Sequence, residues 1–161
     1  MISEGLKISG WVMMELWDPN GKLLARDEGP NLIVDEGLDF IIDTALSGST
    51  QDTTFFVGLK DTGTPLASWT LATGLTEINP YTGNRIAWTE DNTATDQSVS
   101  NSVAPASFAI TATDTVFGAL LATVNTGTAG TLIGAKDFAA SQAVNNGDTL
   151  NVTYTINASS S

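Results

Sequence analysis

Apolar residues recur at every second position through residues 6–17, which is the period of a β-strand. The residues of this parity include Leu6, Ile8, Val12, Met14 and Leu16. The opposite parity is mixed, because Trp11, Met13 and Trp17 stand there among polar residues. We therefore expect one face of the strand to join the core and the other face to be partly covered.

A turn and a return strand are predicted next. Asp18-Pro19-Asn20-Gly21 has the composition of a β-turn, since Pro fixes φ and Gly tolerates a positive φ. Residues 22–28 are predicted to complete a hairpin with the first strand. Gly29-Pro30 is expected to break the chain before a short extended piece, residues 31–34.

One helix is expected within residues 35–48. Its apolar positions follow the spacing i, i+3, i+4, i+7 and i+8, and they are Leu38, Ile41, Ile42, Ala45 and Leu46. Asp35 is predicted to cap the N-terminus, and Ser47-Gly48 is predicted to end the helix.

From residue 51 onward, short apolar and β-branched runs alternate with turn signals, and no long helical pattern separates them. The predicted strands are 54–60, 85–90, 106–112, 116–124, 131–135 and 149–156. Residues 69–81 are interpreted as an ordered loop. This pattern predicts a mainly β fold, an antiparallel β-sandwich of the jelly-roll or Ig-like kind. The whole chain is expected to form one compact domain, with the hairpin in 1–34, the helix in 35–48 packed on the sandwich, and the sandwich in 49–161.

Composition narrows the functions that are open to this chain. The 161 residues include no cysteine and no histidine, which excludes thiolate chemistry and removes the commonest general base. Eighteen acidic residues against 6 basic ones give a net charge of −12, so we expect no binding to nucleic acid and no attraction to an anionic membrane. Since neither a membrane-spanning run nor a secretory signal is visible, synthesis in a cytoplasm is expected.

No catalytic constellation can be identified, so the chain is interpreted as non-enzymatic, without a cofactor or a metal. Asp18-Pro19-Asn20-Gly21 departs from the spacing of a calcium loop, and a hairpin turn is the better interpretation. Asp39 and Asp43 are spaced as on the solvated side of a helix. Glu90-Asp91 with Asp96 could line a loop site for Ca²⁺, and a small glycosidase that needs only two carboxylates is a third hypothesis for function.

Aromatic residues give the remaining candidates. Trp11 and Trp17, with Met13, share the mixed face of the first strand and are interpreted as candidates for a protein interface. Trp69 and Tyr81 lie in the loop of residues 69–81, where an exposed ring beside Asn or Asp could stack on a sugar. The second hypothesis is therefore a carbohydrate- or receptor-binding module that recognises a glycan on a host surface.

A series of short segments, in a fixed order, resembles a family of virion structural proteins from tailed bacteriophages. The segments are Asn31-Leu32-Ile33-Val34 with Gly37-Leu38, Phe56-Val57-Gly58-Leu59, Leu75-Thr76-Glu77-Ile78 before Tyr81, Gln97-Ser98-Val99-Ser100-Asn101-Ser102, Ala106-Ser107-Phe108-Ala109-Ile110, Gly118-Ala119-Leu120-Leu121 and Gly147-Asp148-Thr149-Leu150-Asn151-Val152-Thr153-Tyr154. Together they span residues 31–156, which is nearly the whole predicted sandwich.

This family is similar to capsid decoration (cement) proteins. The resemblance implies a homotrimeric β-sandwich on the outer capsid surface of a virion, assembled from chains made in the bacterial host. It implies that the partner is the major capsid protein, bound at the junctions between its subunits. Similar sandwiches occur on tail fibres and tailspikes, which keeps the receptor-binding alternative open. No catalytic residue is carried over from the family.

Overall fold

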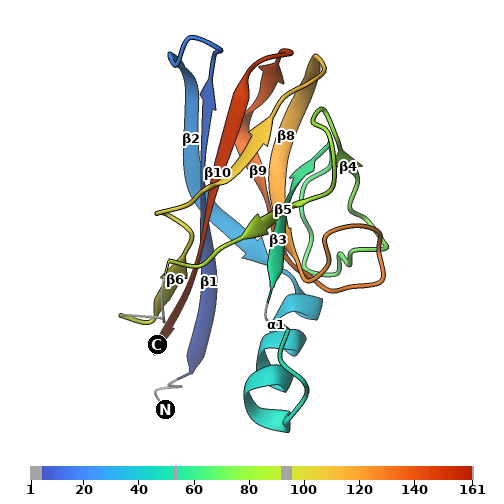
Figure 1. Ribbon diagram of the computed structural model, residues 1–161. Coiled ribbons are helices and arrows are strands. Elements are labelled where there is room, and N and C mark those ends of the chain that lie inside the picture. The colour runs from blue at the N-terminus through green and yellow to red at the C-terminus, as the bar shows by residue number, and fades with distance from the viewer. Residues whose placement is uncertain (1–4, 53, 92–95, 161) are drawn as a thin grey trace.

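The computed structural model describes residues 5–52, 54–91 and 96–160, and it consists mainly of antiparallel β-strands (Figure 1). The strands are β1 (Leu6–Trp17), β2 (Leu23–Ile33), β3 (Phe55–Lys60), β4 (Glu77–Ile78), β5 (Ile86–Trp88), β6 (Ser98–Ser100), β7 (Ala106–Ala109), β8 (Asp114–Ala122), β9 (Leu132–Val144) and β10 (Thr149–Ser160). The helix α1 (Asp35–Ile42) continues into a π-helical turn, η1 (Asp43–Ser47). The expectation of a mainly β, antiparallel fold with a short helix is confirmed.

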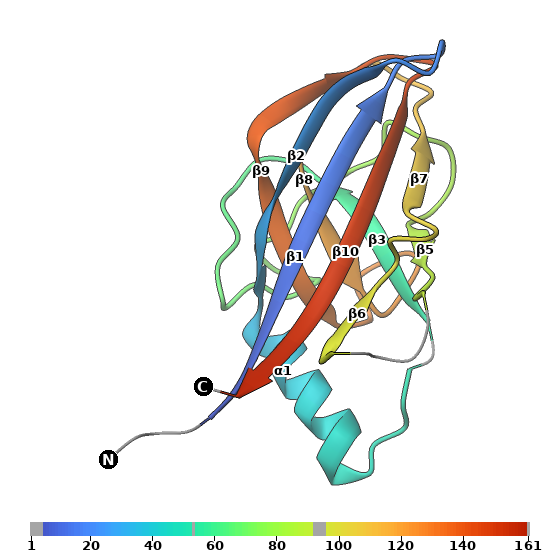
Figure 2. The same cartoon turned by 90° about the vertical axis from the view of Figure 1, so that its left-hand side faces the viewer.

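The strands form one curled sheet in the order β4-β3-β8-β9-β2-β1-β10-β6, with β5 paired to β3 and β7 paired to β10. The curl places β1, β2 and β10 in one layer and β3 and β8 in a facing layer, a sandwich-like arrangement (Figure 2). β2 links the layers, because it pairs with β1 through Asn31 and then with β9 through Leu32 and Ile33. The finer jelly-roll or Ig-like description stays a prediction.

The N-terminal hairpin is an integral part of the sheet. β1 lies between β2 and β10 and pairs with β10 along its entire length, from Leu6 opposite Ser160 to Trp17 opposite Thr149. The predicted alternation in residues 6–17 is confirmed where the two layers meet. There Val12, Met14 and Leu16 are buried against residues of the facing layer such as Val57 and Leu121. Residues 1–34 therefore supply part of the central core.

A polar pair lies inside the fold where β2 crosses between the layers. The Asn31 side-chain amide donates a hydrogen bond to the Tyr154 hydroxyl, and both side chains are buried. Gly10 and Gly134 make room for this pair, because a Cβ at either glycine would lie within 2.6 Å of an Asn31 side-chain atom. Burial raises the pKa of the Tyr154 hydroxyl, since the ionised form would lose its hydration.

The predicted chain break at Gly29-Pro30 is wrong, because β2 runs through both residues without interruption. Proline lacks a backbone donor and is tolerated where a strand has one partner. Pro30 meets that condition, since it lies opposite Trp11 of β1, while the pairing of β2 with β9 involves only Leu32 and Ile33.

The helix begins and packs differently from the prediction. Asp35 is the first residue of α1; Val34 occupies the N-cap position without a side-chain cap hydrogen bond, so the predicted Asp35 cap is wrong. Gly37 lies against β9, where a Cβ would be 2.2 Å from the Ile133 carbonyl oxygen. The helix runs past the end of the sandwich (Figure 1), and Leu46, the last residue of the predicted apolar stripe, is 79% exposed. Gly48 ends the helix at φ 79°, as predicted.

Several strand limits also differ from the prediction. β9 continues to Val144 through a segment of small and polar residues that has no apolar alternation, and β4 and β6 were not predicted. One edge of β10 pairs with β7 at residues 149–152 and with β6 at residues 155–157. Between these ladders the buried Asn101 side chain takes the place of a strand: its Oδ1 accepts from the Tyr154 N–H at 2.7 Å, and its Nδ2 donates to the Val152 carbonyl at 3.2 Å.

Candidate functional site

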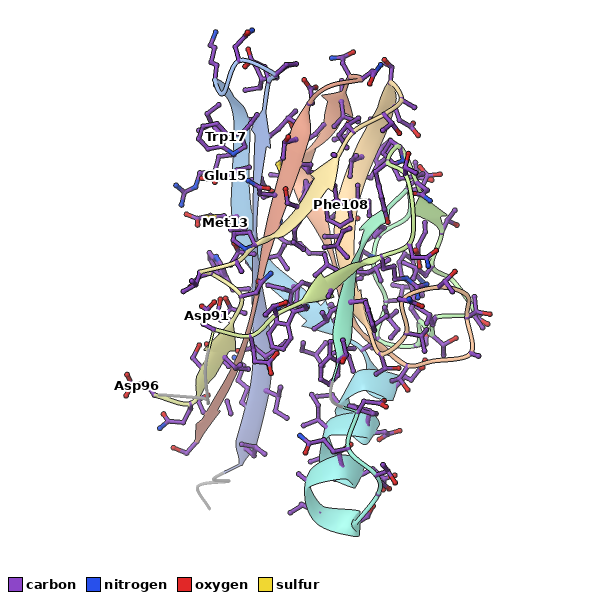
Figure 3. The ribbon with its side chains drawn as sticks, viewed as in Figure 1. Met13, Glu15, Trp17, Asp91, Asp96 and Phe108 are labelled. Atoms are coloured by element: carbon purple, nitrogen blue, oxygen red, sulfur yellow. The ribbon has the colours of Figure 1, made fainter. Side chains whose placement is uncertain are left out.

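The solvent-facing side of the hairpin is the surface that the sequence singled out. Met13, Glu15 and Trp17 project from β1 away from the facing layer (Figure 3), and Trp11 shares their parity. In register with them on β2 are Arg26, Glu28 and Pro30, opposite Glu15, Met13 and Trp11 respectively. We call these seven residues (Trp11, Met13, Glu15, Trp17, Arg26, Glu28 and Pro30) the outer hairpin face.

Apolar side chains occupy both ends of this face. Trp11 is 44% exposed and lies opposite the exposed Pro30, so a ring and a pyrrolidine sit side by side in water. At the other end, Trp17 pairs with the exposed Leu23 after an irregularity in the register. Met13 lies half-buried between these two ends. The structure thus brings the three predicted interface candidates onto one surface.

The indole of Trp17 has an unsatisfied donor. Its Nε1 atom is buried, yet no described residue supplies a hydrogen-bond acceptor for it. A buried donor without a partner costs about 1–3 kcal/mol.

Charged residues fill the middle of the face. The Arg26 guanidinium lies 3.8 Å from a Glu15 carboxylate oxygen and 3.4 Å from a Glu28 oxygen. Exposed pairs of this kind contribute little to stability, about 0–1 kcal/mol. The two ion pairs orient the Arg26 guanidinium between two carboxylates, so charges of both signs lie between the two apolar ends of the face.

The loop candidates Trp69 and Tyr81 do not form an exposed ligand site, which corrects the expectation for the glycan hypothesis. Trp69 is 8% exposed and Tyr81 6%. The Trp69 ring lies 5.7 Å from the Nζ of the buried Lys60 and close against Gly74, whereas Tyr81 packs edge-to-face on Phe108 at 4.7 Å. Burial raises the pKa of Tyr81 to about 12. Neither ring is free to stack on a sugar.

The acidic candidates serve the local structure. Asp18 accepts hydrogen bonds from the backbone N–H groups of Asn20 and Lys22, which lower its pKa and close the hairpin turn. Asp43 accepts bonds from the Ser47 and Ser49 hydroxyls, which lower its pKa.

The suggested Ca²⁺ loop around Asp91 is also not formed by the described residues. Asp91 accepts from the Ser102 hydroxyl and from the backbone N–H groups of Ser102 and Val103, and these bonds lower its pKa. Asp96 lies farther out on the same side (Figure 3). Across residues 5–52, 54–91 and 96–160, no three His, Cys, Asp or Glu side chains group as metal ligands.

On β2 the sequence predicts the return strand that carries Arg26 and Glu28 but not their part in this face, and the predicted break at Gly29-Pro30 left Pro30 off the strand. In the structure Leu24, Arg26, Glu28, Pro30 and Leu32 are all exposed and alternate with less exposed residues. The residue types do not alternate between apolar and polar, so the sequence carries no clear signal for this face.

Comparison with protein-family models, with curated proteins and with solved structures gave no match to this chain. In the part of the chain that the structure describes, no helix is long and apolar enough to span a bilayer.

Proposed function

We propose that this chain is a structural protein of a tailed-phage virion, a capsid decoration protein that binds the outer shell as a trimer and stabilises contacts between major capsid protein subunits. The ordered sequence resemblance suggests this class. Its segments coincide largely with strands of the fold, including Phe56–Leu59 in β3, Ala106–Ala109 in β7 and Thr149–Tyr154 in β10.

The observation that carries the proposal is the outer hairpin face. The solvent side of an antiparallel sheet is usually polar, and Trp and Met are enriched where proteins meet. Trp11, which lies between Pro30 and Thr155 in the register of the sheet, keeps 44% of its surface in water. A partner that covers the face would remove the exposed part of Trp11 from water.

The magnitude of this contact can be worked out from burial. A Trp side chain buries about 150–250 Å², so covering the exposed 44% of Trp11 removes roughly 70–110 Å² from water. At about 25 cal/mol per Å², this contributes about 2 kcal/mol per copy. A protein that binds the assembled shell but not its separated subunits stabilises the shell by mass action. A shell has many equivalent binding sites, so the total stabilising free energy is large even when the free energy per site is modest. The net charge of −12 opposes non-specific association between free trimers before they bind the shell.

Binding to empty heads tests the proposal. Purified chain is mixed with expanded heads that lack it, and bound copies are counted after sedimentation. Trp11→Ser should weaken binding by roughly 30-fold, which is the equivalent of about 2 kcal/mol. Leu66→Ser is the matched control, because Leu66 is an exposed apolar residue in the β3–β4 loop and not on the outer hairpin face.

Unchanged binding of Trp11→Ser, or equal loss in both variants, would count against the outer hairpin face as the contact surface. Failure of the wild-type chain to bind any such head would count against the decoration role itself. Point substitutions are required because β1 lies inside the sheet, so deletion of the hairpin would remove Val12, Met14 and Leu16 from the core.

A further inference from the structure

An apolar cavity of about 360 Å³ is lined by residues of α1, of the start of β1 and of the end of β10. These elements face one another at one end of the sandwich (Figures 1 and 2). Its lining comes from both layers and from the helix. Ile8, Ile156, Phe40, Ile41 and Trp88 all contribute, and no lining residue among those described carries a charge.

The cavity follows from the unequal lengths of the two layers. β1 and β10 pair to their ends, so the inward-facing Ile8 and Ile156 extend past the strands of the facing layer. Opposite Ile8 and Ile156 lies α1, which is only 8 residues long. The helix packs against β9, where Gly37 closely approaches Ile133. The helix therefore closes one side of this end and leaves the space open.

One wall is already held in place. Phe40 meets Phe55 edge-to-face with ring centroids 6.0 Å apart, and Phe55 meets Trp88 in the same manner at 6.0 Å. The Trp88 indole is fixed in turn, because its Nε1 donates to the Tyr154 carbonyl at 2.9 Å. A preorganised apolar wall lowers the ordering cost of binding.

We propose that this cavity binds the alkyl chain of an uncharged amphiphile. Its volume lies within the range of about 300–1,000 Å³ that is typical of small-molecule sites, and such sites combine apolar walls with a few polar groups. In this cavity the lining surface is almost entirely apolar, so the alkyl chain fills the cavity while an uncharged hydroxyl or ester headgroup stays in water at its open side. An anionic headgroup would find no cation in the lining, and the net charge of −12 would oppose it.

At β6, the backbone beside the cavity is not open to an added peptide strand. β6, which lines the cavity, pairs with β10 on one edge. On the other edge the Asp91 N–H donates to the Ser100 carbonyl at 2.7 Å, and at the end of β6 the Gln97 carbonyl accepts from the Ala158 N–H at 2.8 Å. Strand addition depends on free main-chain groups. An alkyl chain needs none.

The test uses N-phenyl-1-naphthylamine, an uncharged fluorescent probe, with the full chain. Wild-type protein should bind one probe per chain in a saturable manner, and alcohols should displace it. Each added CH₂ contributes about 0.8 kcal/mol, so decanol, with two more CH₂ groups, should compete roughly 15-fold more tightly than octanol. Decanoate should compete less well than decanol, because the site offers no positive charge.

Two substitutions separate the cavity from the rest of the surface. Ala158→Trp fills the cavity from β10, whereas Ala109→Trp adds the same ring at an exposed position of β7 outside it. Probe binding should be lost in the first variant and retained in the second. Ile41→Gln, on the helix side, should weaken binding without a large insertion, which keeps the test valid if Ala158→Trp does not fold.

Three results would overturn this proposal, which does not depend on the decoration role. They are the absence of saturable probe binding, undiminished binding in both Ala158→Trp and Ile41→Gln, and competition that does not change with alkyl length. Sedimentation analysis of the same samples adds a fourth. If wild-type chains associate, exclude the probe, and separate in the Ala158→Trp variant, the occupant is a second copy of this chain.

Discussion

Replacing Asn101 should destabilise the fold more than its place in a loop suggests. Its side chain fills the interval between the β6 and β7 ladders on the edge of β10, accepting from the Tyr154 N–H at 2.7 Å and donating to the Val152 carbonyl at 3.2 Å. Asn101→Ala leaves both buried main-chain groups without these partners. At about 1–3 kcal/mol for each unsatisfied group, the expected loss is about 2–6 kcal/mol.

The assay is equilibrium unfolding in urea, with the free energy obtained by linear extrapolation. A loss of this size is a large part of the 5–15 kcal/mol that is typical of a domain. Asn84→Ala removes the same side chain from an exposed position and should change stability by less than about 0.5 kcal/mol. Amide exchange at Tyr154 should also accelerate in Asn101→Ala. A loss below about 1 kcal/mol, or one equal to that of Asn84→Ala, would refute the role assigned to Asn101.

Three further outcomes are expected. Burial raises the pKa of Tyr81 to about 12 and also raises the pKa of Tyr154, and these are the chain's 2 tyrosines, so absorbance should show no tyrosinate in the folded protein near pH 10. The stability that the two neutral hydroxyls contribute is complete below pH 10, the pKa of tyrosine in the unfolded chain, and is lost as pH rises through about 12. Ionisation of either tyrosine near pH 10 without unfolding would contradict this. Gly37→Ala should lower the thermal midpoint despite the helix preference for Ala of about 1 kcal/mol, because its Cβ would lie 2.2 Å from the Ile133 carbonyl oxygen, and a raised midpoint would contradict that packing. Native mass spectrometry should give a trimer, and a monomer at micromolar concentration would count against the proposed assembly.

Strict alternation made some elements predictable. Residues 6–17 were predicted with their observed limits, and the strand that begins at Thr149 was found because Leu150, Val152 and Tyr154 mark its buried face. The sequence rule that proline breaks a strand failed at Pro30. A strand tolerates proline where it pairs with only one neighbouring strand, and the number of neighbouring strands cannot be determined from the local sequence.

The candidate site could be predicted only in part. Trp11, Met13 and Trp17 share a face because their spacing in a strand requires it. Exposure of a loop aromatic follows no such rule. Trp69 is buried because its ring packs beside Lys60 and Gly74, and no local sequence pattern predicts these contacts. The same holds for Asn101, whose partners lie more than 50 residues away along the chain.

Electron microscopy of a virion that contains this chain tests the proposed function most directly. We predict trimeric density on the outside of the capsid, at junctions between major capsid protein subunits, with Trp11 and Trp17 covered by a neighbouring subunit or a neighbouring copy. Density confined to the tail, or shell-bound copies whose outer hairpin face remains fully open to solvent, would contradict it.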